Sequence, residues 1–85
     1  MRHLTAAAVL ALLPFGAVAA PPPADALALS DIIAKIETDL GDTLAYIDEV
    51  NWDDDGYWEV EYRTTDNAEV DIRVDPITGE TLPRR

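Results

Sequence analysis

The 85-residue sequence lacks cysteine altogether and contains a single histidine, His3. Without cysteine the chain cannot form a disulfide or a thiolate-ligated metal cluster, and one histidine excludes a histidine-rich metal site and a catalytic triad of the usual kind. Basic residues are also scarce, since Lys and Arg total 6 against 17 Asp and Glu, a formal charge of −11. This charge disfavours nucleic acid and anionic lipid as partners and favours basic peptides, cationic proteins or metal cations; solubility alone is the alternative explanation.

Residues 1–19 contain no acidic residue and have the organisation of a cleavable secretory signal. A weakly basic start is followed by an apolar stretch, residues 4–13, and then by the small-residue motif Ala17-Val18-Ala19. Cleavage after Ala20 would place the ring of Pro21 beside the scissile bond and hinder attack. We therefore expect cleavage between Ala19 and Ala20.

The alternative for this segment is an uncleaved membrane anchor. A membrane-spanning helix needs about 20 apolar residues, whereas residues 4–18 provide only 15 and include Pro14 and Gly16. We expect a periplasmic or secreted bacterial protein with no stable membrane span after cleavage. The mature chain would have 66 residues, with 17 acidic and 5 basic side chains and a formal charge of −12.

One amphipathic helix is predicted over residues 29–40, after a proline-rich spacer at residues 20–28. Apolar side chains recur there at i, i+3, i+4, i+7 and i+11 and form a single stripe; they are Leu29, Ile32, Ile33, Ile36 and Leu40. Ser30 is the expected N-cap, although Asp25 could cap a longer helix, and Gly41 is the expected left-handed C-cap. Asp31 and Lys35 are spaced for an ion pair along the helix.

The apolar period changes from 3.6 to 2 beyond the helix, which indicates strands. The residues expected to point inward are all even-numbered: Val50, Trp52, Trp58, Val60, Tyr62, Val70, Ile72 and Val74. Directly opposed residues must therefore share the same parity. Placing Trp52 opposite Trp58 and Val60 opposite Ile72 leaves three-residue loops at 54–56 and 65–67, with Gly56 and Asn67 at their left-handed positions.

Residues 44–47 do not fit this alternation, because Ile47 is out of phase with Val50. Either a β-bulge near Asp48 and Glu49 or a loop crossing the edge of the core would explain the break. Both interpretations remain open from the sequence. Further on, residues 75–80 form a turn, and residues 81–82 can add a short final strand.

The predicted sheet has one apolar and one acidic face, so its apolar face and the apolar stripe of the helix must cover each other. We predict an α+β domain over residues 29–82, in which one amphipathic helix packs on an antiparallel sheet of three to four strands. Residues 83–85 are expected to be a flexible C-terminal end.

Three segments carry a family resemblance: SDIIAKIE, VNWDDDGYWEVEY and VDIRVDPITGETL. The Asp55-Gly56 hairpin leading into an aromatic-rich strand, and the sequence Asp75-Pro76-Ile77-Thr78-Gly79-Glu80, resemble the PepSY domain family of peptidase propeptides and small secreted bacterial proteins. The resemblance implies a PepSY-like fold and a non-catalytic domain that binds or inhibits a peptidase. It implies no catalytic residue and no cofactor, and it does not identify the target.

The candidate partner-binding surface is the outward phase of the sheet, comprising Tyr57, Glu59, Glu61, Glu69 and Asp71. We expect Tyr57 to be exposed among these acids, where its ring could engage a basic or extended peptide. An open edge strand is a further place where a peptide could add by backbone pairing. The sequence thus predicts an exported, non-enzymatic module that binds an unknown protein or basic peptide, with a peptidase as one candidate.

A different hypothesis uses the first hairpin as a calcium-responsive element. Asn51, Asp53 and Asp55, followed by Gly56, copy the first half of a calcium loop. The position that should supply a bidentate glutamate is occupied by Tyr62. Ordinary hairpin-turn chemistry also explains this motif, so the cation-responsive domain is the alternative function.

Overall fold

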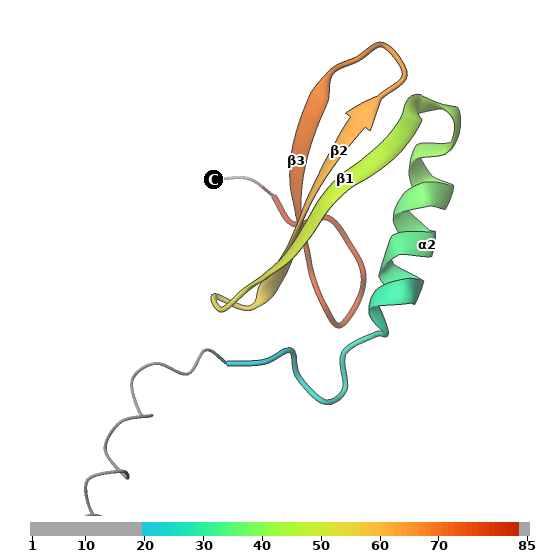
Figure 1. The fold of residues 1–85 in the computed structure, drawn as a ribbon. Helices are drawn as coiled ribbons and strands as arrows, with labels where there is room; N and C mark the ends of the chain where they lie inside the picture. The colour runs from blue at the N-terminus through green and yellow to red at the C-terminus, as the bar shows by residue number, and fades with distance from the viewer. Residues whose placement is uncertain (1–19, 84–85) are drawn as a thin grey trace, which may run out of the picture.

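The structure, a computed structural model, describes residues 20–83, and the predicted signal peptide at residues 1–19 lies outside that part (Figure 1). The elements follow in the order α2 (Leu29–Leu40), the 3-10 helix η2 (Gly41–Thr43), β1 (Leu44–Asp53), β2 (Tyr57–Thr64) and β3 (Glu69–Val74). Within residues 20–83, no helix combines the length and apolar character needed to cross a membrane.

The three strands form an antiparallel sheet in the order β1-β2-β3, and α2 packs against one face of it (Figure 1). The predicted α+β arrangement is confirmed, with three strands rather than four. The segment after β3 contributes only an isolated bridge between Val74 and Thr81. Pro83 follows closely, and a proline has no N–H with which to continue a ladder.

The predicted helix bounds of 29–40 are confirmed, but a Ser30 N-cap would start the helix at Asp31, two residues after its observed start at Leu29. Ala28 is the N-cap residue, with extended backbone and no capping side chain, so the expectation for Ser30 is wrong. The Leu27 N–H donates to the Pro76 carbonyl at 2.9 Å, which fixes the direction of the chain just before the helix. At the other end Gly41 adopts φ 53°, the positive value predicted for the C-cap.

The core lies between the helix stripe and the inward side chains of the sheet. Its buried members are Ile32, Ile36, Val60 and Val74, with Leu40, Ile47, Val50, Trp58 and Ile72 packed around them. Leu29, at the first helical position, is 37% exposed, so the buried part of the apolar stripe begins at Ile32. The predicted pairing of helix and sheet is therefore what excludes water from the domain.

The predicted register is confirmed on both sides of β2. Trp52 lies opposite Trp58, and Val60 lies between Val50 and Ile72. The register shifts between Ile47 and Glu49, so the phase break is a bulge. The bulge leaves Asp48 as the extra residue and brings Ile47 opposite Tyr62, on the inner face.

Candidate functional site

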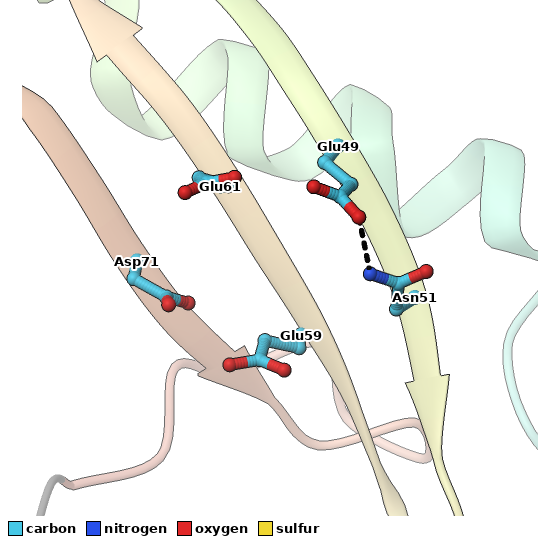
Figure 2. Close-up of a pocket in the computed structure, with 5 residues that line it drawn as sticks. All are labelled: Glu49, Asn51, Glu59, Glu61 and Asp71. Carbon is cyan, nitrogen blue, oxygen red and sulfur yellow. Dashed lines mark hydrogen bonds between the residues drawn. The ribbon is translucent and has the colours of Figure 1, made fainter.

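The outer face of the sheet, opposite α2, carries a group of acidic side chains. Glu49 and Asn51 from β1, Glu59 and Glu61 from β2, and Asp71 from β3 line an open depression of about 230 Å³ there (Figure 2). Strand alternation explains this gathering, because each residue lies in the outward phase of its strand. We call these five residues the acidic face.

Pairing across the strands concentrates negative charge at the centre of the acidic face. Glu61 lies directly opposite Glu49 on one side and Asp71 on the other. Like charges in directly opposed positions destabilise a sheet. Asn51 is the neutral member, and its amide Nδ2 donates to Glu49 Oε2 at 2.8 Å. A cationic group placed over the depression would relieve this repulsion.

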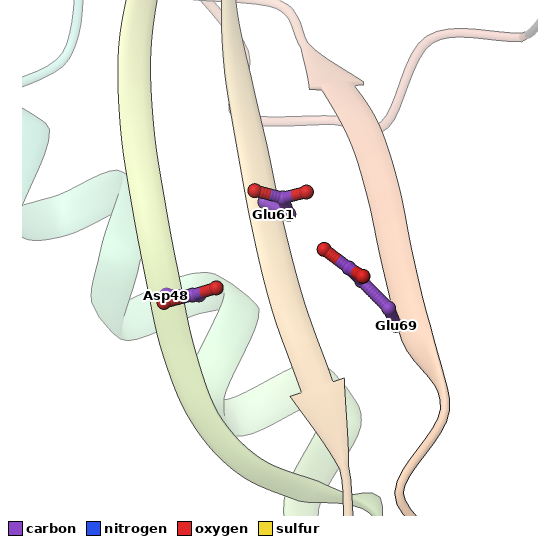
Figure 3. A group of neighbouring side chains, drawn as sticks. All are labelled: Asp48, Glu61 and Glu69. Atoms are coloured by element: carbon purple, nitrogen blue, oxygen red, sulfur yellow. The ribbon is translucent and has the colours of Figure 1, made fainter.

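A second group of carboxylates adjoins the acidic face at Glu61. Carboxylate oxygens of Asp48, Glu61 and Glu69 lie within 4.8 Å of one another (Figure 3). A hydrogen bond with Glu69, then desolvation, then the charges of Glu69, Glu49 and Asp48 raise the pKa of Glu61 to about 7. The raised pKa of Glu61 lowers the negative charge of this region near neutral pH.

Basic groups approach the edges of the acidic face. Arg63 Nη2 lies 3.8 Å from Glu69 Oε1, and Arg73 lies opposite Glu59 in the register. Both positions match the opposite-charge pairs that the register predicts. They leave the central carboxylate, Glu61, with acidic neighbours on both adjoining strands.

The surroundings of Tyr57 differ from the sequence expectation. The residue is half-buried rather than exposed, and the Arg73 guanidinium carbon lies 5.1 Å from the ring centroid. Arg73 lies on the neighbouring strand in the same outward phase, so it can cover the ring and gain a cation–π contact. Desolvation is the main cause that raises the pKa of Tyr57, and it exceeds the opposing effect of Arg73. The Arg73 side chain thus covers part of the Tyr57 ring.

The residues of the calcium hypothesis are divided between two places. Asn51 faces Glu49 and lines the acidic face. Carboxylate oxygens of Asp53, Asp54 and Asp55 lie within 4.8 Å of one another at the β1–β2 turn. Asp53 Oδ1 accepts the Asp55 N–H at 2.9 Å, which is the local hydrogen bond of an Asx turn. The turn therefore has a structural explanation that needs no cation.

Of the candidate binding residues, the structure brings Glu59, Glu61 and Asp71 together on the acidic face. Glu69 adjoins them through Glu61. The sequence prediction did not include Asp48 and Glu49 in this surface. The phase break at Ile47 was the available signal, since a bulge at Asp48 adds a carboxylate beside Glu61.

Comparison with known proteins identifies one family match. The family model described as "peptidase propeptide and YPEB domain" matches residues 3–85. Searches of curated proteins and of solved structures gave no significant match.

Proposed function

This chain belongs to the peptidase propeptide and YPEB domain family, and on that premise we propose that it is an exported, non-enzymatic binding module that modulates a peptidase or another envelope protein. The family consists of propeptide-like domains that are generally not catalytic. Such a domain acts through contact with its partner. The acidic face is the surface that we assign to this contact.

The observation that carries the proposal is the gathering of like charge on the acidic face. Four carboxylates surround one depression, and Glu61 has acidic neighbours across both ladders. Proteins gain association rate and specificity when such a surface meets a complementary potential. A basic segment of a peptidase, or a basic peptide, is the partner that fits. Its binding should weaken as salt screens the exposed charges.

The shape of the acidic face supports binding rather than hydrolysis. Two carboxyl groups can hydrolyse a substrate only in a site that orients it and excludes water. The depression here is shallow and open to solvent on the sheet surface (Figure 2). The export part of the proposal is supported by the signal-like residues 1–19, and it assigns the partner to the periplasm or the cell exterior.

Crosslinking in the native bacterial envelope tests this function. The full chain is expressed with its leader, and crosslinked partners are identified by mass spectrometry. A Glu49→Gln/Glu59→Gln variant removes two charges from the acidic face, and Asp31→Asn/Glu37→Gln removes two from the exposed side of α2 as the matched control. We expect a reproducible partner with the wild type and the control, and a loss of capture with the acidic-face variant.

The same experiment has outcomes that contradict the proposal. Equal capture by the acidic-face variant and the control would exclude the acidic face as the contact surface. Repeated captures without a partner above background would argue against a binding module.

A second candidate, a cation-responsive domain, draws on the three neighbouring carboxylates Asp53, Asp54 and Asp55. It predicts that Ca²⁺ stabilises the fold. The binding module makes no such prediction, so a calcium titration separates the two candidates.

A further inference from the structure

The segment that precedes α2 contacts the domain at both ends. At its start, the Trp52 indole N–H donates to the Ala20 carbonyl at 2.8 Å. At its end, the Leu27 N–H donates to the Pro76 carbonyl at 2.9 Å. Between them, the Ala26 N–H donates to the Pro23 carbonyl at 3.1 Å and closes a turn. Figure 1 shows this segment passing the end of the β1–β2 hairpin before it enters α2. We call residues 20–27 the N-terminal strap.

The anchor at the start of the strap is held in place by an aromatic contact. Trp52 is half-buried, and its ring packs edge-on against Trp58 with centroids 5.1 Å apart and planes at 66°. This contact restricts the rotamer of Trp52 and therefore the direction of its N–H. An indole nitrogen only donates, so this position selects a carbonyl or another acceptor.

The residue that Trp52 holds is the one that signal cleavage would expose. The motif at residues 17–19 and the proline at position 21 predict, from sequence alone, that the mature chain begins at Ala20. In the structure, the carbonyl of that same residue accepts the hydrogen bond from the Trp52 indole N–H. We infer that Trp52 is the binding site for the N-terminal residue of the processed chain, and that this contact holds the strap against the domain in the mature protein. This inference uses the export part of the proposed function but not the acidic face.

Docking of Ala20 should protect the N-terminus from trimming, and this gives a direct test. The mature chain begins with Ala20-Pro21, and an aminopeptidase specific for X-Pro can cleave this bond and release Ala20. The full chain is expressed in a bacterial host that processes the leader, and the exported product is weighed by mass spectrometry. It is then treated with the aminopeptidase, and loss of Ala20 is followed by intact mass.

Two variants with matched loss of an indole N–H isolate the anchor. Trp52→Phe keeps an aromatic ring but removes the donor to Ala20. Trp58→Phe is the control: it keeps an aromatic ring against Trp52, and the Nε1 that it removes is buried without a hydrogen-bond partner among residues 20–83. We expect Trp52→Phe to lose Ala20 roughly two- to tenfold faster than the wild type, as for loss of one hydrogen bond. Trp58→Phe should resemble the wild type, and thermal unfolding should show that both variants are folded at the assay temperature.

Each outcome is decisive for a separate part of the inference. An exported chain that does not begin at Ala20 would overturn the premise of processing at this bond. Equal trimming of Trp52→Phe and Trp58→Phe would overturn the anchor and leave the acidic-face proposal intact.

Discussion

Replacing Glu61 with glutamine should change how the stability of the domain depends on pH. Glu61 lies opposite Glu49 and Asp71 and shares a hydrogen bond with Glu69, so ionising it adds a charge to an acidic neighbourhood. The pKa of its carboxyl is raised from 4.5 to about 7 in the folded protein. Because the folded state holds this proton more tightly than the unfolded chain does, folding takes up a proton at intermediate pH.

The size of this effect follows from the two pKa values. At pH 5.5, Glu61 is roughly 97% protonated in the folded state and roughly 9% protonated in the unfolded chain. Folding therefore takes up about 0.9 proton at this residue. The unfolded chain binds fewer protons, so this contribution to stability is complete below pH 4.5. It declines as pH rises and is lost above about pH 7.

Glutamine is uncharged at every pH and keeps the approximate shape of protonated glutamate. Glu61→Gln should therefore match the wild type near pH 4 and exceed its melting temperature above pH 7. Thermal unfolding followed by circular dichroism from pH 4 to 8 measures this difference. Glu37→Gln on the exposed side of α2 is the control for removing one carboxylate elsewhere.

NMR titration of the Glu61 side-chain carboxyl carbon provides the direct readout, with an expected midpoint near 7. A midpoint near 4.5 would refute the assigned coupling between Glu61 and its neighbours. So would wild-type and Glu61→Gln melting temperatures that stay parallel across the whole pH range.

Three further predictions concern the core, the hairpin turn and the cation alternative. Ile32 is fully buried, so Ile32→Ala should lower the free energy of unfolding by about 2–5 kcal/mol. This loss is comparable to the roughly 3–5 kcal/mol of stability expected for a domain of this size. Urea denaturation should therefore show a largely unfolded Ile32→Ala variant, whereas Ile32→Val should stay folded with a lower midpoint. Gly56 has φ 106° with open space around it, so Gly56→Ala should cost about 1–2 kcal/mol through backbone strain alone, and an unchanged urea midpoint would contradict the assigned turn. Under the binding-module proposal, millimolar Ca²⁺ should not change the melting temperature; micromolar-range stabilisation that disappears in Asp53→Ala/Asp55→Ala would instead favour the cation-responsive domain.

The outward and inward directions of the strand residues could be predicted from the sequence because strand periodicity is a local property. A side chain two residues further along lies on the same face whatever the rest of the chain does. Parity and turn chemistry then restricted the pairing, and the predicted oppositions of Trp52 with Trp58 and Val60 with Ile72 were correct. The left-handed residues Gly56 and Asn67 occupy the turn positions that their types predict.

The ion pairs and caps were harder to predict, because several local partners compete on similar terms. The helical spacing predicted a pair of Lys35 with Asp31, but Lys35 pairs with Asp39, also four residues away, at 2.9 Å. Lys35 Nζ also lies 4.0 Å from Oε2 of Glu80, which belongs to the turn after β3. Spacing along a helix cannot reveal this distant carboxylate. The helix bounds were predicted correctly, but the N-cap residue is Ala28 rather than Ser30.

The sequence by itself therefore determined the α+β class, the strand register and the existence of an acidic sheet face. Only the tertiary structure showed that the bulge brings Asp48 beside Glu61 and Glu69, that Arg73 covers Tyr57, and that Trp52 holds Ala20. The physical reason is the range of each effect. Periodicity and turn preferences act over a few neighbouring residues. The carboxylate cluster, the cation–π contact and the hydrogen bond to Ala20 depend instead on distances between segments that meet only when the chain folds.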